Sequence, residues 1–374
     1  MLTRRGLLTG AAAAAVQSLH AAPRAEVKAI EIISQQPEFY HGWPTVALRS
    51  SGELLVVCSG GREAHVCPFG RVEMIRSSDG GRSWSWPEVL MDSAIDDRDS
   101  GVYETQSGTL LVTTFTSLAY EPVLSRATNW PQERLAKWQA VNRRASEQQR
   151  KALLGTWMLR STDGGMTWSA PFRVPVNSPH GPTGLSDGRL LYAGKQLWSP
   201  GLKVGVAEST DDGRTWRWLS DIPARSGDKV EEYHELHAVQ AANGHVIVHI
   251  RNHNRENERE TLQCESTDGG KTWTTPHPIG VWGLPSHLLK LRNGNLLMSY
   301  GYRRKPFGNL ARISVDHGRT WSEPLVISSD AASVDVGYPS TVELADGRLI
   351  TVWYELPSNS PRAVLRKAEW SVRL

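Results

Sequence analysis

Side chains that could do acid–base or nucleophilic chemistry stand at constant distances from six glycine turns in this chain of 374 residues. Counting nine residues back from the turn glycines gives Trp43, Asp99, Pro179, Glu235, Pro285 and Tyr338. Counting seven to ten residues forward gives Arg62, Lys195, Arg251, Arg303 and Arg304. A carboxylate beside a phenol can activate it as a nucleophile, and guanidinium groups bind anions with paired hydrogen bonds.

Histidines and further carboxylates flank these positions. The neighbouring titratable residues are His41, Glu63, His65, Asp96, Asp97, His180, His234, His237, His253 and His287. An ordinary solvent-exposed surface would be rich in lysine and glutamate. The residues here are instead histidine, aspartate and tyrosine, and they stand beside glycine and proline. Convergent titratable groups suggest a concave site for catalysis or binding. We therefore expect His41, Arg62, Asp99 and His237 to contact a substrate.

The glycine turns belong to six predicted β-hairpins. Each hairpin has an alternating apolar run, a glycine turn, often of the Asp-Gly or Asn-Gly kind, and a second apolar run, which is a strong hairpin signal. The turn glycines are Gly52, Gly108, Gly188, Gly244, Gly294 and Gly347. Because each turn fixes its hairpin, the start of the first strand and the end of the second must lie together on the rim opposite the turns.

A second repeat follows each of the first five hairpins. It reads Ser-x-Asp-x-Gly-x-Ser/Thr-Trp and begins at Ser77, Ser161, Ser209, Ser266 and Ser314. Its aspartate accepts bonds from nearby backbone N–H groups, its glycine supplies a positive φ and its tryptophan buries a large ring, so these are framework residues. One unit then holds four strands: two in the hairpin, one ending at the aspartate turn and one after the tryptophan. We predict an all-β, six-bladed β-propeller.

One propeller accounts for residues 26–374, because the hairpins follow one another without a linker. The net charge of +3, with acidic and basic residues mixed throughout, argues against a nucleic-acid partner. No apolar run is long enough for membrane insertion of the mature chain.

Residues 1–25 carry Arg4-Arg5 and then a short apolar stretch, which is the pattern of a twin-arginine export signal. This pattern predicts a periplasmic or secreted protein.

The three cysteines and one insertion leave alternatives open. Cys58 and Cys67 flank one loop closely enough to form a disulfide in that compartment, although they could equally be small buried hydrophobes, like Cys264. The second hairpin is followed by an insertion, residues 116–156, in which a helix could start near Pro131. This helical insertion could be a structural cap or a wall of the binding cleft.

At these residues the chain resembles the sialidase (neuraminidase) superfamily of six-bladed propellers, which carry the same aspartate-box repeats. Glu235 stands sixteen residues before Arg251, in that family's pattern, and residues 337–355 are similar to its closing segment. The resemblance implies that Tyr338 is the nucleophile, that Glu235 activates it, and that Arg251 and Arg303 belong to the arginine cluster that binds a substrate carboxylate.

The first blade departs from that family. Gly42 stands in the place of the family's first arginine, and the loop from Gly61 to Arg71 lacks the expected acid/base aspartate. Four residues could take that role instead: Glu63, His65, Asp97 and Asp99. The carboxylate cluster would then hold only Arg251 with Arg303 or Arg304, which favours a different acidic or neutral sugar over sialic acid.

These features favour an exported glycoside hydrolase that releases a terminal, acidic sugar from a glycan through Tyr338 and Glu235, without a cofactor. Two alternatives remain: a polysaccharide lyase, in which Tyr338 or His65 removes a proton from a uronate, and a non-catalytic carbohydrate-binding propeller. We expect no metal, because the histidines lack a ligand spacing; His41, His65 and His237 are the least unsuitable ligands. The sequence leaves the oligomeric state open.

Overall fold

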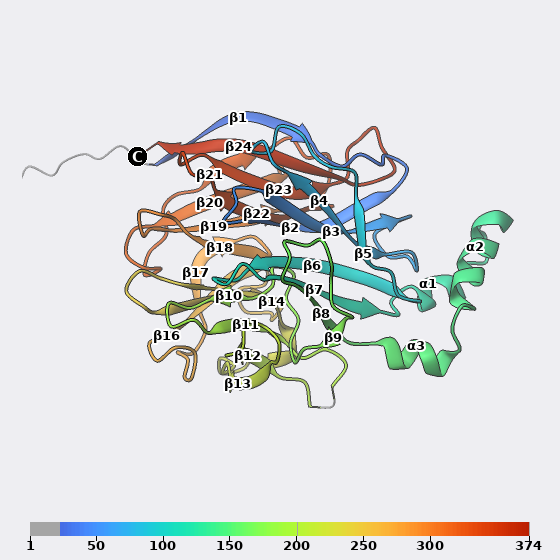
Figure 1. Ribbon diagram of the computed structural model, residues 1–374, viewed down its shortest axis with the longest axis horizontal. Helices are drawn as coiled ribbons and strands as arrows, with labels where there is room; N and C mark the ends of the chain where they lie inside the picture. The colour runs from blue at the N-terminus through green and yellow to red at the C-terminus, as the bar shows by residue number, and fades with distance from the viewer. Residues whose placement is uncertain (1–22, 200, 374) are drawn as a thin grey trace, which may run out of the picture.

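The computed structural model describes residues 23–199 and 201–373 and arranges them as six four-stranded antiparallel sheets (Figure 1). The predicted all-β, six-bladed propeller is confirmed. Most of the predicted export signal lies outside the described residues, and strand β1 already begins at Arg24, two residues before the predicted start of the propeller at residue 26.

Each blade runs outward from an innermost strand that lies near the axis. Blade one holds β2 (Tyr40–Leu48), β3 (Leu54–Arg62), β4 (Arg71–Ser77) and β5 (Glu88–Met91). Blade two holds β6 (Asp96–Glu104), β7 (Leu110–Ser117), β8 (Thr156–Ser161) and β9 (Phe172–Arg173). Blade three holds β10 (Thr183–Gly184), β11 (Leu190–Lys195), β12 (Val204–Ser209) and β13 (Arg217–Asp221).

The last three blades follow the same plan. A short 3-10 helix, Val230–Glu232, precedes blade four, which holds β14 (Tyr233–Gln240), β15 (Val246–Asn252), β16 (Glu260–Ser266) and β17 (His277–Trp282). Blade five holds β18 (Ser286–Lys290), β19 (Leu296–Tyr302), β20 (Gly308–Ser314) and β21 (Leu325–Ser328). Blade six holds β22 (Val336–Glu343), β23 (Leu349–Glu355), β24 (Val364–Arg373) and β1 (Arg24–Ile32).

The two ends of the chain close the ring. Strand β1, blue in Figure 1, pairs along its length with β24, in red, with Arg24 opposite Arg373. The outermost strand of blade six therefore comes from the other end of the sequence. This closure ties the first and last segments together.

The aspartate boxes hold the framework as predicted. In the first box, Asp79 Oδ1 accepts the backbone N–H groups of Arg82 and Ser83, both at 3.0 Å, and Oδ2 accepts the Ser83 hydroxyl at 2.6 Å. The corresponding aspartates of the other boxes accept bonds in the same way: Asp163, Asp211, Asp268 and Asp316. These carboxylates are used by their own turns, so they do not contribute to a site.

A β-bulge recurs at the same place in four innermost strands. Trp43, Asp99, Glu235 and Tyr338 all have positive φ, of 53°, 41°, 44° and 56°, and each lies where the pairing register shifts. A bulge re-aims the side chain it carries, and such backbone strain is common at functional sites. The constant distance from the turn glycine therefore has a structural cause, since it marks the bulge in these four blades.

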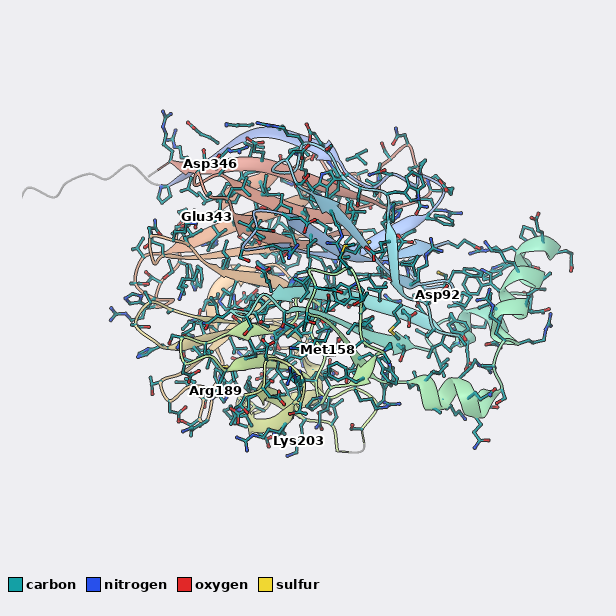
Figure 2. All side chains as sticks on the ribbon, in the orientation of Figure 1. Asp92, Met158, Arg189, Lys203, Glu343 and Asp346 are labelled. Carbon is teal, nitrogen blue, oxygen red and sulfur yellow. The ribbon has the colours of Figure 1, made fainter. Side chains whose placement is uncertain are left out.

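The insertion after β7 contains three helices, α1 (Glu121–Ser125), α2 (Gln132–Asn142) and α3 (Glu147–Leu153). They project at one side of the molecule (Figure 1), and Trp138 of α2 packs in a cluster with Cys67, Ile95 and Tyr120. None of the described helices is long and apolar enough to cross a membrane. Figure 2 shows Asp346 and Arg189, in hairpin turns, on the side opposite to Asp92, which precedes β6.

Three histidines from neighbouring blades meet in the channel along the axis. The rings of His180, His237 and His287 lie 4.7–5.3 Å apart, and they line a cavity of about 370 Å³ that extends toward the hairpin turns. His237 Nδ1 accepts the backbone N–H of Leu288 at 2.9 Å. His237 therefore lies beyond the bulge, down the channel, and not on the rim where the triad residues lie; its contact with substrate stays a prediction.

Burial of these histidines predicts a loss of stability in acid. Burial lowers the pKa of His180, His237 and His287 well below the usual 6.5, so the unfolded chain binds more protons as the pH falls through that value. Burial raises the pKa of Asp97 to about 8 and of Asp99 to about 7, and protonation of these two carboxyls stabilises the folded state as the pH falls. Because this opposes the loss of stability caused by the histidines, the test compares wild type with a variant that lacks one histidine. Below about pH 6.5 the free energy of unfolding of wild type should fall more steeply than that of His287→Gln, by about 1.4 kcal/mol per pH unit. Denaturant titrations at pH 7.5, 6 and 5 measure both slopes, and equal slopes would contradict the prediction.

Candidate active site

A tyrosine, a carboxylate and an arginine meet at the axis on the rim opposite the hairpin turns. The Tyr338 hydroxyl donates to Glu235 Oε1 at 2.6 Å. Arg251 Nη1 donates to Glu235 Oε2 at 2.5 Å and to Tyr338 Oη at 3.0 Å. The bulges of β14 and β22 aim the first two side chains inward, and the end of β15 supplies the arginine opposite His234. The structure thus brings together the three residues that the sequence paired by spacing.

The charges in this triad favour a neutral phenol beside an ionised carboxylate. Burial, followed by the charge of Glu235, raises the pKa of Tyr338 well above 10, although Arg251 opposes this. Burial alone would raise the pKa of Glu235, but the Arg251 charge and the hydrogen bonds from Tyr338 and Arg251 outweigh it and lower that pKa. Glu235 is therefore placed to accept the phenolic proton when Tyr338 reacts.

Asp99 faces the same space from the second blade. It is only 6% exposed, and its Oδ1 is buried without a hydrogen-bond partner among the described residues. Burial, together with the charge of Glu235, raises the pKa of Asp99 to about 7, although the charge of Arg98 opposes this. An unpartnered buried oxygen at the floor of a site is available to a ligand hydroxyl.

A pocket of about 490 Å³ opens beside the triad, between blades four, five and six. Arg251, Arg303, Arg259 and Trp282 are among its lining residues. Arg303 Nε donates to the Val336 carbonyl at 2.9 Å and has no carboxylate partner among the described residues. Arg304 instead stacks on the Trp282 ring, 4.0 Å from its centre, so of the two predicted arginines Arg303 is the one that lines the pocket.

The first blade presents aromatic rings where the family pattern has an arginine. Trp43 is buried, and the guanidinium groups of Arg62 and Arg98 both lie over its ring, with their central carbons 4.9 and 4.4 Å from the ring centre. Arg62 is fully buried and donates to both oxygens of Asp96, at 2.6 and 3.0 Å. This corrects the prediction that Arg62 binds substrate, because its charge is already neutralised beneath the floor of the site.

His65 is the exposed member of the first-blade loop. Its side chain is 48% exposed, and Nδ1 lies 3.0 Å from Tyr40 Oη and 3.1 Å from Asp335 Oδ1. Burial would raise the pKa of Asp335, but the hydrogen bond and charge of His65 and the hydroxyls of Tyr40 and Tyr354 lower it. Of the residues expected in that loop, His65 is thus the one held at the mouth of the site.

Three other predicted site residues point away from it. Glu63 bonds the α2 side chains of Arg134 and Trp138, so it anchors the helical insertion. Asp97 turns its carboxylate to Ser93, whose backbone N–H and hydroxyl donate at 2.7 and 2.8 Å. His41 is 2% exposed and lies 3.6 Å from Glu73. The predictions of catalytic roles for Glu63 and Asp97, and of substrate contact for His41, are therefore corrected.

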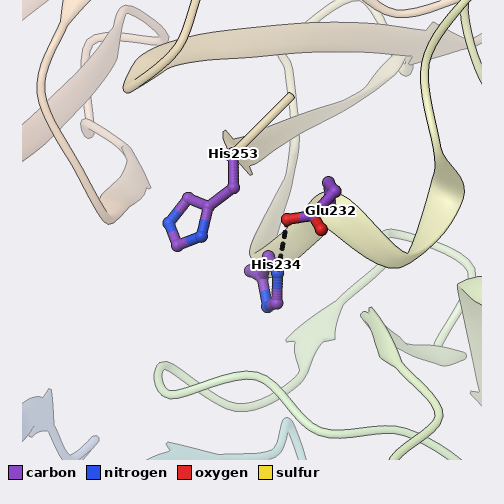
Figure 3. A group of neighbouring side chains, drawn as sticks. All are labelled: Glu232, His234 and His253. Carbon is purple, nitrogen blue, oxygen red and sulfur yellow. Dashed lines mark ion pairs between the residues drawn. The ribbon is translucent and has the colours of Figure 1, made fainter. Parts of the chain in front are cut away.

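A second cluster lies next to Arg251 (Figure 3). Single ligand atoms of Glu232, His234 and His253 come within 4.8 Å of one another, a group that could hold a metal. However, Lys195 Nζ lies 3.4 Å from His234 Nδ1, and Arg251 Nε donates to His253 Nε2 at 2.8 Å. Two cations thus occupy the imidazole lone pairs that a metal would need, and the cluster fits poorly as a metal site.

The sequence analysis placed His234 and His253 near the site but missed Glu232 and the grouping, because the three residues come from a 3-10 helix, the start of β14 and the residue after β15. The pairing of His234 with Arg251 across the hairpin, once the bulge is known, places His253 beside them. The cluster orients Arg251 through His253. The predicted alternative of a disulfide is not realised, since Cys58, Cys67 and Cys264 are all buried and free.

The fold and the site together define a sialidase-like propeller with a Tyr–Glu–Arg centre. The family profile of the BNR repeat-like domain matches residues 104–351, so the chain belongs to the BNR repeat-like family. The resemblance to the sialidase superfamily is confirmed at the level of the fold.

Two curated relatives are glycoside hydrolases. A xyloglucanase of a Paenibacillus species is 26% identical over 205 residues, which are 48% of this chain and 19% of that protein. A sialidase of Micromonospora viridifaciens is 26% identical over 215 residues, 46% of this chain and 31% of that protein. The matched region therefore spans a third or less of either relative.

Solved structures show the same fold. A protein of unknown function from Dyadobacter fermentans superposes with a TM-score of 0.75 at 22% identity, covering 93% of this chain and 99% of that one. An intramolecular trans-sialidase from Ruminococcus gnavus gives a TM-score of 0.63 at 13% identity, with 91% and 95% covered. A Hadza microbial sialidase gives 0.62 at 18% identity, with 88% and 65% covered. At these identities the likeness concerns the fold.

Proposed function

We propose that this chain is a glycoside hydrolase that releases a terminal acidic sugar from a glycan, with Tyr338 as the nucleophile and Glu235 as its base. The observation that carries the proposal is the 2.6 Å hydrogen bond from the Tyr338 hydroxyl to Glu235, in a site that also holds Arg251. A tyrosine nucleophile is a known exception to the two-carboxylate scheme of glycosidases.

The charges around Tyr338 support an acidic substrate. A carboxylate on the reacting carbon would repel an aspartate or glutamate nucleophile, whereas a phenol that gives its proton to Glu235 stays neutral until it attacks. Arg251 and Arg303 both line the pocket beside the triad and can supply the counter-charge. Asp99, with its unpartnered Oδ1, can accept a sugar hydroxyl.

The first blade supports a sugar other than sialic acid. A Cβ placed on Gly42 would lie 3.2 Å from a ring carbon of Tyr40, so the aromatic ring takes the space at this position. The family's first arginine is thus absent from the sequence, and an arginine at this position would also require the Tyr40 ring to shift. Each charge-assisted bond contributes about 1.5–3 kcal/mol, so its loss weakens a sialic-acid-like ligand about 10- to 150-fold.

Export to the periplasm or the medium is also part of the proposal, and it rests on the twin-arginine pattern of the first 25 residues. Fractionation of cells that express the full chain, compared with an Arg4→Lys/Arg5→Lys variant, tests it. Equal amounts of both proteins in the cytoplasm would contradict the proposal.

A panel of 4-nitrophenyl glycosides of N-acetylneuraminic acid, 3-deoxy-ulosonic acids, glucuronic acid and galacturonic acid tests the hydrolase. We expect turnover of at least one other acidic glycoside with a kcat/KM about tenfold or more above that of the sialoside, because the third arginine is missing. A sialoside kcat/KM of about 10⁴ M⁻¹s⁻¹ or more would contradict the sugar assignment. Binding without turnover would favour a carbohydrate-binding propeller, and an unsaturated product that absorbs in the ultraviolet would favour a lyase.

A further inference from the structure

We propose that His65 and Asp335 form a proton-transfer dyad, in which Asp335 holds the imidazole and His65 Nε2 exchanges a proton with the leaving-group oxygen. The inference rests on the proposed function, since it assigns the acid and base of the same reaction. Asp335 directly precedes β22 and stands three residues before Tyr338, so the start of one strand carries both the positioning carboxylate and the nucleophile.

The hydrogen bonds fix which imidazole nitrogen reacts. Nδ1 of His65 faces Asp335 Oδ1 at 3.1 Å and Tyr40 Oη at 3.0 Å. An ionised carboxylate only accepts, and the Tyr40 hydroxyl directs its single hydrogen to Asp335, at 3.0 Å from Oδ2. Nδ1 must therefore carry a hydrogen, which leaves Nε2 as the atom that gives and takes a proton.

The surroundings hold the dyad rigidly. The Tyr354 hydroxyl donates to Asp335 Oδ1 at 3.0 Å, behind the imidazole. Arg62 and Arg98 donate to the backbone carbonyl of His65, at 3.0 and 3.2 Å. The titratable groups that face the ring are thus Asp335 and Tyr40, with the two guanidinium groups held at its backbone.

The position of His65 suits an acid that protonates a departing aglycone. His65 and Tyr338 both pack edge-on against Trp43, with ring centres 4.9 and 6.4 Å from it, so they border one site. An aglycone has to leave toward solvent, and the His65 side chain is 48% exposed, whereas Asp99 is 6% exposed at the floor. His65 therefore reaches the leaving oxygen, and Asp99 reaches the sugar.

The reaction balances in two steps. In the first, Tyr338 Oη bonds to the anomeric carbon and gives its proton to Glu235, while the bond to the aglycone oxygen breaks and that oxygen takes the proton from His65 Nε2. In the second, water bonds to the same carbon and gives a proton to His65 Nε2, while Tyr338 Oη leaves and regains its proton from Glu235.

Leaving-group dependence tests the dyad. For the sugar that wild type cleaves best in the panel, kcat/KM is measured on the 4-nitrophenyl and the benzyl glycoside, since only the poor benzyl leaving group needs an acid. His65→Gln should lose about 100-fold or more on the benzyl glycoside and less than about tenfold on the 4-nitrophenyl glycoside. Asp335→Asn should show the same selective loss, about tenfold or more, and its alkaline limb of activity should move to lower pH.

The control and a second measurement separate the possible failures. Asp346→Asn, which removes an exposed carboxylate in the turn of the same blade, should leave both rates unchanged. Equal losses on both glycosides in His65→Gln would overturn the dyad while leaving the Tyr338 proposal intact, and absence of turnover by wild type would overturn both. Nitrogen-15 spectra of the imidazoles provide a second measurement, in which the signal that disappears in His65→Gln belongs to His65. Neutral His65 should be the Nδ1–H tautomer in wild type, and this tautomer should be lost in Asp335→Asn. An Nε2–H tautomer in wild type would also overturn the dyad.

Discussion

The Tyr338→Phe variant is expected to lose turnover by about 10³-fold or more on any glycoside that the wild-type chain hydrolyses, a cost of about 4 kcal/mol in transition-state stabilisation. The hydroxyl is the group that would bond to the anomeric carbon, and it donates to Glu235 at 2.6 Å. The ring itself remains in phenylalanine and keeps its packing against Trp43 and Tyr354. The fold should therefore survive the change, and single-turnover kinetics with thermal unfolding measure the two effects separately.

Tyr192→Phe is the matched control for that variant. Tyr192 is also fully buried, and its hydroxyl donates to the Ser178 carbonyl at 2.9 Å and has no hydrogen bond to a member of the triad among the described residues. Its loss should cost stability, about 1–3 kcal/mol, and leave the turnover of the folded protein nearly unchanged. A Tyr338→Phe variant with more than a tenth of wild-type turnover would show that the hydroxyl is not the nucleophile.

The propeller could be predicted from the sequence because its repeats are local. Each hairpin is specified by alternation around one glycine turn, and each box by an aspartate that bonds its own backbone, as Asp79 does. The same locality explains why the triad could be found. Glu235 and Tyr338 occupy the bulge at one fixed distance from their turns, and Arg251 ends the paired strand.

The remaining site residues could not be placed, because the direction of a side chain near a bulge depends on three-dimensional contacts. Asp97 and Asp99 differ by two positions, yet the bulge between Arg98 and Gly101 sends Asp99 into the site, while Asp97 bonds Ser93. Glu63 and His65 are also two positions apart, but Glu63 forms an ion pair with Arg134 of the insertion. No sequence periodicity reports such long-range partners.

Burial also determines which arginines can bind a substrate. Arg62 is the last residue of β3 and Arg251 the last but one of β15, so their places in the hairpins do not distinguish them. Asp96 neutralises Arg62 with two bonds beneath the floor of the site, whereas Arg251 lines the open pocket. The insertion bears on the same question, because its anchoring to Glu63 and the Cys67 cluster supports the loop that carries His65.

Glu235→Gln is expected to lower kcat/KM by about 10²- to 10⁴-fold at neutral pH, because the base that accepts the phenolic proton is removed. The amide also leaves Arg251 without its counter-ion, since that arginine donates to Glu235 at 2.5 Å. The charge of Glu235 contributes to the raised pKa of Tyr338, after burial, and Arg251 opposes it. In the variant the phenol should therefore ionise at a lower pH than in wild type.

That shift gives the variant a distinctive pH dependence. On a 4-nitrophenyl glycoside, which needs no acid to expel the leaving group, the rate of Glu235→Gln should rise with pH as the phenolate forms without a base. Glu208→Gln is the matched control, because Glu208 is a 3% exposed carboxylate that also bonds two arginines, Arg189 and Arg217, in blade three. It should lose stability and keep both its rate and its pH profile. A Glu235→Gln rate that stays above a tenth of wild type, or that does not rise with pH, would mean that Glu235 does not take the proton of Tyr338.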